Sequence, residues 1–189
     1  MNADLLVYQA KAFYNAYIAL DQLSRDDSDA LLLLFAPLIV NGAFSVELTL
    51  KAILAKNKIE YGKEHNLLIL FQMLPKSFQQ ELWTFLTEKA PEYANFERGL
   101  NELILLSNAF VDWRYAFEGK PVPAIESRFL AAFANAAVHT MFSYYNADLL
   151  PATKTESNNE IEQRFHENRE KCKEINLKMI QKKTKEHQL

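Results

Sequence analysis

The sequence predicts an all-α protein. Only four glycines and six prolines occur among 189 residues, which is too few for the many turns of a β protein. Apolar side chains recur at helical spacing in successive segments, and no alternating strand pattern interrupts them. We therefore expect an up-and-down bundle of about five to seven helices within residues 1–150, with a charged helix or tail over 151–189.

Two helices are expected at the N-terminal end of the chain. Apolar residues repeat at helical spacing over 3–23, and a charged turn at 24–28 separates this segment from a second helix that continues to about Lys56. Pro37 either kinks the second helix or restarts it as a first-turn residue. Gly42 has no side chain, so it lets another helix approach closely.

Shorter helices are expected to follow. A polar loop, in which Gly62 is a candidate for positive φ, leads into a short helix opened by His65-Asn66-Leu67. Gly119 stands at the position of a helix C-cap. Apolar periodicity predicts three more helices, over 77–89, 93–118 and 125–146.

Two charges interrupt the apolar sector of the second helix. Glu47 and Lys51 are four residues apart, so they share one helix face with apolar neighbours such as Phe44. The small polar residues Ser45 and Thr49 fall nearly opposite. A buried charge without a partner costs several kcal/mol or neutralises itself, so we expect Glu47 and Lys51 to be paired inside a helical core.

Bulk composition excludes several classes of function. The net charge is −3, with 21 basic and 24 acidic residues, so any nucleic-acid binding must be local. The single cysteine, Cys172, excludes an intrachain disulfide and a thiolate metal cluster. There is no phosphate-binding glycine loop, zinc-binding histidine pattern or serine nucleophile elbow. We expect no cofactor and no metal site.

The location is expected to be cytoplasmic. The N-terminus lacks a basic segment followed by an apolar run, so no signal peptide is expected. The apolar run from Leu31 to Val40 is interrupted by polar residues before it reaches membrane-spanning length, the interruptions being Asn41, Glu47 and Lys51. We therefore expect a soluble protein without a membrane partner.

The end of the chain has a different composition. Residues 152–189 hold nine basic and seven acidic side chains, and Phe165 is their only aromatic residue. Six positions step alternately by four and three, as in a coiled coil or docking helix, and all but Asn168 are apolar: Ile161, Phe165, Asn168, Cys172, Ile175 and Met179. Two interpretations stay open, a helix over 159–184 that binds a protein partner and a solvated tail.

A second polar segment combines charges with aromatic residues. Arg114 and Glu118 are four residues apart at the end of a strongly apolar segment, and Trp113, Tyr115 and Phe117 flank them. A bare pair at this spacing is usually exposed and contributes little, but the aromatic neighbours favour partial burial. We expect Glu47, Lys51, Arg114 and Glu118 to form one connected polar group, to which His65 is a candidate addition.

Three separated motifs follow one another along the chain: Asn41-x-x-Phe44-x-x-Glu47-Leu48-x-Leu50-Lys51-Ala52-x-Leu54, His65-Asn66-Leu67, and Phe110-Val111-x-Trp113-Arg114-Tyr115-x-Phe117-Glu118. In this order they resemble the motifs of the HEPN superfamily of small helical bundles. The likeness covers roughly residues 35–145, and it is to the bacterial branch with a Glu-Leu-x-Leu-Lys helix and a Trp-Arg-Tyr segment.

The resemblance implies an up-and-down bundle, a homodimer, and a cleft lined by polar residues. It also implies metal-independent RNA cleavage, which the family performs with an arginine followed four to six residues later by a histidine. Arg114 matches this arginine loosely, but the next histidine along the chain is His139. The catalytic pattern of the family is therefore missing.

Three functional hypotheses follow. The first is a HEPN-like module that binds RNA or a nucleotide phosphate through Arg114 and Lys51, in a toxin–antitoxin or phage-defence system as the resemblance implies. The second is a divergent endoribonuclease in which His65 or Glu118 replaces the missing base. The third is a non-catalytic interaction scaffold. The candidate ligand-binding residues are Glu47, Lys51, His65, Arg114, Tyr115 and Glu118.

Overall fold

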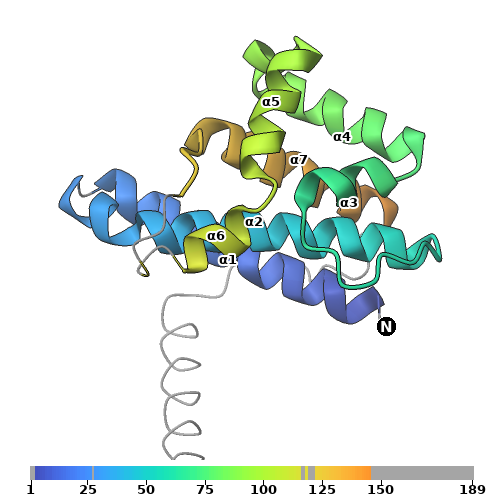
Figure 1. Cartoon of the computed structure of the whole chain (residues 1–189), viewed down its shortest axis with the longest axis horizontal. Coiled ribbons are helices and arrows are strands. Elements are labelled where there is room, and N and C mark those ends of the chain that lie inside the picture. The colour runs from blue at the N-terminus through green and yellow to red at the C-terminus, as the bar shows by residue number, and fades with distance from the viewer. Residues whose placement is uncertain (1–2, 27, 116–117, 119–121, 146–189) are drawn as a thin grey trace, which may run out of the picture. The chain divides into compact units, whose positions relative to one another are not determined.

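The computed structural model describes residues 3–26, 28–115, 118 and 122–145 (Figure 1). Within these ranges the chain is helical and contains no strand, which confirms the predicted all-α class. Seven α-helices and one 3-10 turn lie in the described part of the chain: α1 Ala3–Asp26, α2 Ser28–Lys56, α3 Leu67–Met73, α4 Lys76–Lys89, η1 Pro91–Tyr93, α5 Phe96–Leu106, α6 Ala109–Arg114 and α7 Ser127–Tyr144.

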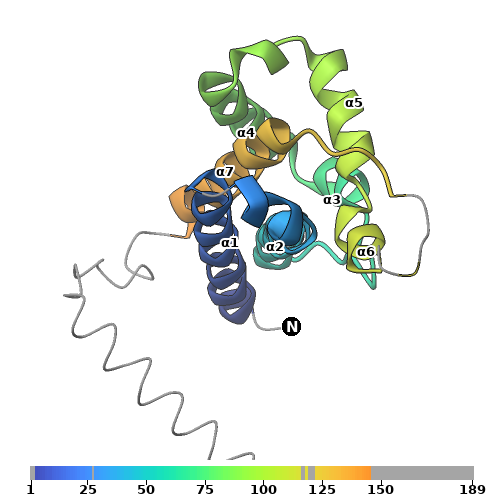
Figure 2. The same ribbon diagram turned by 90° about the vertical axis from the view of Figure 1, so that its left-hand side faces the viewer.

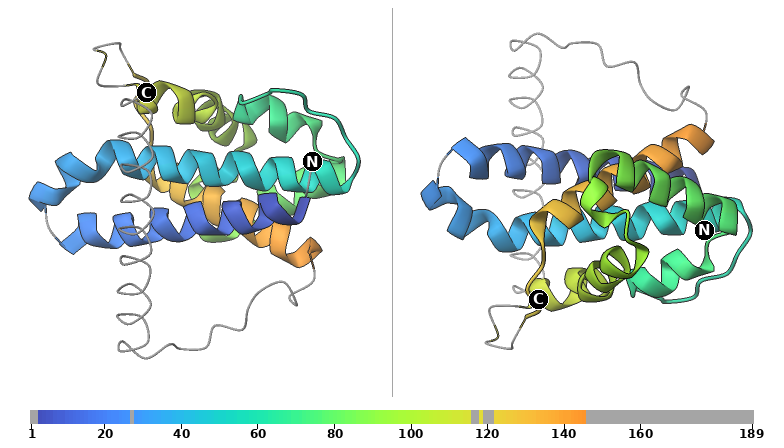
Figure 3. Two further views of the ribbon diagram at one scale, coloured as in Figure 1. Left: turned by 90° about the horizontal axis from the view of Figure 1, so that it is seen from below. Right: turned by 90° about the horizontal axis from the view of Figure 1, so that it is seen from above.

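Helix α2 is the centre of the bundle. Seen almost end-on in Figure 2, it has α1, α7, α3 and α6 around it, and it packs against all four. Figure 3 shows α1 lying alongside α2 in the opposite direction. Because α2 has neighbours on several sides, it also buries Ser45 and Thr49, whose hydroxyls donate to the carbonyls of Gly42 and Ser45, each over 2.7 Å.

Gly42 permits the close packing expected of it. A Cβ atom added there would lie 3.0 Å from Leu130 Cδ2 of α7 and 3.0 Å from Tyr17 Cδ2 of α1. Pro37 lies inside α2 and does not end it. The side-chain amide of Asn41 donates to the Pro37 carbonyl over 2.7 Å. Helix α2 therefore continues past Pro37 into the segment that carries Glu47.

The loop between α2 and α3 turns sharply. Gly62 has a φ of 55°, as expected from the sequence, and Lys58 also has a positive φ of 58°. The short helix α3 begins at Leu67 and is capped by Asn66, whose side-chain oxygen accepts a hydrogen bond from the Ile69 N–H. The cap is thus Asn66, and His65 stands one position before it.

The single helix expected over 93–118 is wrong. The structure divides this segment into η1, α5 and α6, with a break at Ser107 and Asn108. The Ser107 carbonyl accepts a hydrogen bond of 2.8 Å from Leu67 N, and the Asn108 side chain accepts one of 3.1 Å from the Asn66 amide. These bonds join the break to the start of α3. They connect segments that are distant in sequence, so the local periodicity of apolar residues could not predict the break.

Two expectations fall outside the described residues. Helix α6 ends at Arg114, with Tyr115 as its C-cap, so the helix stops short of the Gly119 position, which is itself not described. The chain divides into two units, Met1–Asn146 and Ala147–Leu189, close to the boundary expected after residue 150. The charged helix or tail expected over 151–189 lies in the second unit and outside the described residues.

One stretch of α2 meets the length and composition of a membrane-spanning helix. The stretch from Leu34 to Lys56 is 23 residues long and contains an 18-residue window with a mean hydropathy of 1.6. Asn41, Glu47 and Lys51 therefore do not keep it below membrane-spanning length, contrary to the sequence expectation. However, 78% of this window is buried inside the bundle, and core helices of globular proteins pass the same test. The stretch is therefore weak evidence for membrane insertion.

A hydrogen bond from the buried Tyr145 side chain joins the end of α7 to α2. The Tyr145 hydroxyl donates to the Ala52 carbonyl over 2.9 Å, and burial raises the pKa of Tyr145 to about 12. Since this folded-state pKa lies above that of an exposed tyrosine, the stabilisation is present below about pH 10 and is lost as the pH rises through the folded-state value.

We predict that Tyr145→Phe lowers the free energy of unfolding by about 1 kcal/mol at neutral pH, because it removes one buried hydrogen bond. Tyr144→Phe is the matched control, since Tyr144 is exposed and should change stability by less than about 0.5 kcal/mol. Urea denaturation followed by circular dichroism measures both. Equal effects of the two substitutions would contradict the assignment of the stabilisation to Tyr145.

Candidate functional site

The centre of the candidate site is a buried ion pair on α2. Glu47 is 1% exposed and Lys51 is 8% exposed, and the Lys51 ammonium lies 2.7 Å from Glu47 Oε1. Helix α2 has neighbours on several sides, so a side chain in the middle of its apolar sector cannot reach bulk water. The sequence prediction that these two charges are buried and paired is confirmed.

His65 binds the same carboxylate oxygen from outside. Its Nδ1 lies 2.9 Å from Glu47 Oε1, while 52% of its side chain remains exposed. Because an ionised carboxylate only accepts hydrogen bonds, Nδ1 carries the hydrogen, and Nε2 of the neutral ring is left as an acceptor. The structure therefore presents an exposed imidazole whose orientation is set by a buried carboxylate.

The loop before α3 positions His65. The Glu64 carboxylate accepts hydrogen bonds of 2.8 Å from the backbone N–H groups of both His65 and Asn66. The bond from Asn66 is the main cause that lowers the pKa of Glu64; burial opposes it, and the bond from His65 lowers this pKa further. Asn66 then caps α3 and bonds to Asn108, which fixes the backbone on the far side of His65.

Lys51 has little surface to offer a ligand. Its ammonium is paired with Glu47, and it also lies 5.5 Å from the centre of the Tyr61 ring, in the loop that follows α2. A lysine with this burial and these two neighbours neutralises the buried carboxylate. The direct phosphate contact expected of Lys51 is therefore not supported by its position.

Arg114 is exposed, and aromatic rings support it. Its guanidinium carbon lies 4.8 Å from the centre of the Phe110 ring and 4.7 Å from that of Tyr115, and its Nη2 donates to the Tyr115 hydroxyl over 3.1 Å. The Phe110 ring stacks on Phe44 of α2 at 4.2 Å, and Phe13 of α1 meets Phe44 edge-on at 4.5 Å. A row of rings thus connects the exposed guanidinium to the core.

Two groups of contacts are observed among the expected polar residues, and the single connected group that includes Glu118 stays a prediction. Glu47 contacts Lys51 and His65, whereas Arg114 contacts Phe110 and Tyr115. Arg114 and Glu118 are both exposed, so the partial burial expected for them is wrong. Arg114 is the last residue of α6, so its side chain lies at a helix end.

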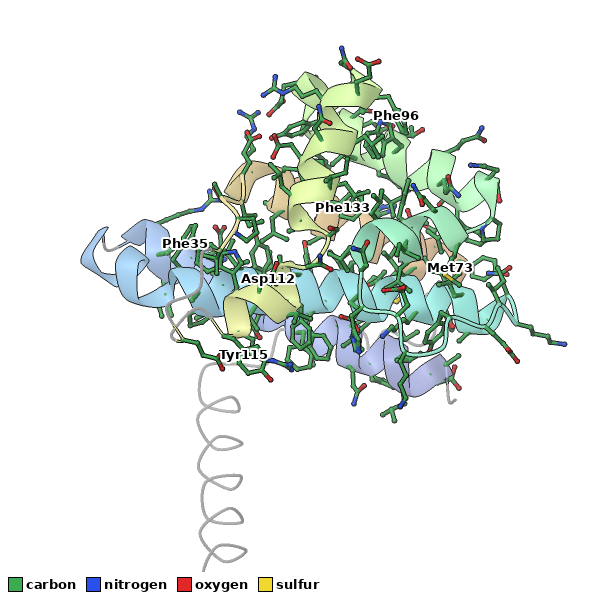
Figure 4. All side chains as sticks on the ribbon, viewed as in Figure 1. Phe35, Met73, Phe96, Asp112, Tyr115 and Phe133 are labelled. Carbon is green, nitrogen blue, oxygen red and sulfur yellow. The ribbon has the colours of Figure 1, made fainter. Side chains whose placement is uncertain are left out.

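The two groups nevertheless share one face of α2. Phe44, which supports Phe110 and Arg114, is three residues before Glu47, which holds His65, so the two supports lie on successive turns. Figure 4 shows Tyr115 at the end of α6. We define the exposed face that carries His65, Arg114 and Tyr115 as the His65–Arg114 face.

Sequence reasoning missed the polar side chains that hold this face together. Glu64 and the Asn66–Asn108 bond fix the loop around His65, but only Asn66 stood in a recognised motif. The available signal was the helix N-cap preference of asparagine at position 66. Among the described residues, no group of three or more His, Cys, Asp or Glu side chains could hold a metal ion.

Comparisons with protein-family models, with curated proteins and with solved structures found no match to this chain. The likeness to the HEPN superfamily therefore rests on the three sequence motifs alone.

We predict that Glu47→Ala lowers the free energy of unfolding by about 3–5 kcal/mol, because it leaves the Lys51 ammonium buried without its partner. The matched control is Asp21→Ala, which removes an ion pair of the same spacing between Asp21 and the exposed Arg25 on α1. This exposed pair should contribute less than about 1 kcal/mol. Chemical denaturation measures both, and a loss of less than 0.5 kcal/mol in Glu47→Ala would show that the pair is not buried in solution.

Proposed function

We propose that the protein is a HEPN-like helical module that binds RNA or a nucleotide phosphate at the His65–Arg114 face. The observation that carries this proposal is the exposed Arg114 guanidinium, which is held against Phe110 and Tyr115 and bonded to the Tyr115 hydroxyl. The family resemblance suggests a toxin–antitoxin or phage-defence setting for this binding.

The chemistry of Arg114 suits a phosphate. A guanidinium presents several N–H donors in a fixed planar arrangement that matches two oxygens of a phosphate, and it stays charged at any physiological pH. The aromatic rings limit the orientations of the side chain, so less conformational entropy is lost when a ligand binds. An exposed tyrosine beside the guanidinium also offers a surface on which a base can stack.

This proposal assigns different roles to the two basic residues named from the sequence. Arg114 contacts the ligand, whereas Lys51 neutralises Glu47 and keeps that carboxylate in place for His65. Binding should therefore depend on salt, as expected for an ionic contact with phosphate, even though the net charge of the whole chain is −3.

We predict that Arg114→Ala weakens binding of a labelled single-stranded oligoribonucleotide at least tenfold and reduces its salt dependence, since a charged hydrogen bond to phosphate contributes about 1.5–3 kcal/mol. Arg128→Ala is the control, because Arg128 is exposed on α7 and pairs with Glu92. Fluorescence anisotropy at several salt concentrations measures both variants. Equal losses in the two variants would mean that binding is unspecific, and undiminished binding by Arg114→Ala would remove the basis of the proposal.

A second candidate function is metal-independent RNA cleavage, and the His65–Glu47 contact favours it. Cleavage needs a general base for the 2′-hydroxyl, a proton donor for the leaving oxygen and a cation for the phosphate. His65 is suited to one proton transfer because its ring is exposed and oriented by Glu47, and Arg114 supplies the cation. The candidate named for the second proton transfer is Glu118, whose side chain is exposed.

Because one of the three roles lacks a well-positioned residue, we predict binding with little or no cleavage. The measurement incubates the full chain with end-labelled RNA in EDTA and compares it with His65→Ala and Arg114→Ala. Wild-type cleavage that both substitutions abolish, and that the control His139→Ala retains, would establish the endoribonuclease. If the protein neither binds nor cleaves RNA or nucleotides, the interaction scaffold is the hypothesis that stands.

The proposal includes the partners expected from the sequence. They are a second copy of the chain, in a two-fold homodimer, and a protein that binds the segment 159–184. The cytoplasmic location also stays a prediction.

A further inference from the structure

His65 and Arg114 differ in one property that decides how their face responds to pH. Arg114 carries its charge throughout the physiological range, whereas histidine side chains gain and lose a proton between about pH 5 and 8. Both side chains are exposed, and their supports Glu47 and Phe44 lie on successive turns of α2. A ligand with more than one phosphate, such as an RNA strand, can therefore meet both.

The hydrogen bond to Glu47 determines which nitrogen of His65 is offered to the ligand. Nδ1 is directed to the buried carboxylate, 2.9 Å away, so Nε2 is the nitrogen left for the exposed side. In the neutral ring Nε2 is an acceptor and cannot bond to a phosphate oxygen. In the protonated ring Nε2 becomes a charged donor, which is the form that a phosphate binds.

The charged and titratable groups around His65 come from three elements. Helix α2 supplies Glu47 and Lys51, which pair and cancel each other's charge. The loop supplies Tyr61 and Glu64, and the Glu64 carboxylate is directed to the backbone N–H groups of His65 and Asn66. Asn66 bonds to Asn108, the residue before α6, and the charged residues of α6 are Asp112 and Arg114, further along that helix; α3 contains no charged residue. Since Glu47 is already neutralised by Lys51, a proton on His65 adds positive charge to the face.

We propose that His65 is a second phosphate contact, held in place by Glu47 and controlled by its own protonation. Ligands with more than one phosphate group, such as RNA, then bind more tightly as the pH falls. This inference rests on the proposed function, because it assigns regulation by protons to the same face. Glu47 is then a positioning residue, because its hydrogen bond sets which nitrogen of His65 faces the ligand.

The experiment measures binding of an oligouridylate between pH 5.5 and 8 at constant ionic strength in EDTA. Neither the uracil bases nor the phosphodiesters of this probe titrate in that range, and a rhodamine label keeps the signal independent of pH. We expect the wild-type Kd to fall about tenfold from pH 8 to pH 5.5, as one added charged hydrogen bond requires. His65→Gln should lose this dependence.

The control is His139→Gln, since His139 is exposed on α7, where its ring contacts Phe85. It should retain the full pH dependence. A pH dependence that persists in His65→Gln, or that disappears in His139→Gln, would overturn the inference.

Two further outcomes separate this inference from the proposed function. Wild-type binding that does not change with pH, but is lost in Arg114→Ala, overturns the role of His65 and leaves the phosphate-binding function standing. A failure of the wild type to bind the probe at any pH overturns both.

Discussion

The rest of the structure depends on one ion pair, between Glu47 and Lys51 in the centre of α2. A carboxylate that is 1% exposed is stable only with a partner, and Lys51 supplies it at 2.7 Å. The same oxygen then binds His65, so the pair determines where the loop before α3 can lie. A charge that is costly to bury thereby fixes an exposed side chain, which an apolar residue at position 47 could not do.

The second group on this face depends on apolar contacts. Arg114 is placed by Phe110, which stacks on Phe44, which in turn meets Phe13 of α1. These ring contacts do not weaken with salt, whereas exposed ion pairs do. One side of the face is therefore oriented by a buried charge and the other by aromatic packing, and both derive their position from α2.

The all-α class, the long second helix and the buried Glu47–Lys51 pair could be predicted from the sequence, because each follows from local periodicity. The break at Ser107 could not, because it depends on hydrogen bonds to Asn66 and Leu67, about 40 residues away in sequence. The predicted helix 93–118 is divided at this break, and its last part, α6, ends at Arg114, whose side chain is exposed. An error in one helix boundary thus became an error in the burial of a candidate site residue.

The division of roles between the basic residues follows from their chemistry and their burial. A lysine ammonium is a compact charge that can neutralise a buried carboxylate, and Lys51 does so inside the bundle. A guanidinium stacks on aromatic rings and still presents N–H groups at its edge, and Arg114 lies against such rings at the surface. Exchanging the two residue types would place a poorly stacking charge at the surface and an oversized planar group in the core. The identity of each basic residue therefore matters as much as its charge.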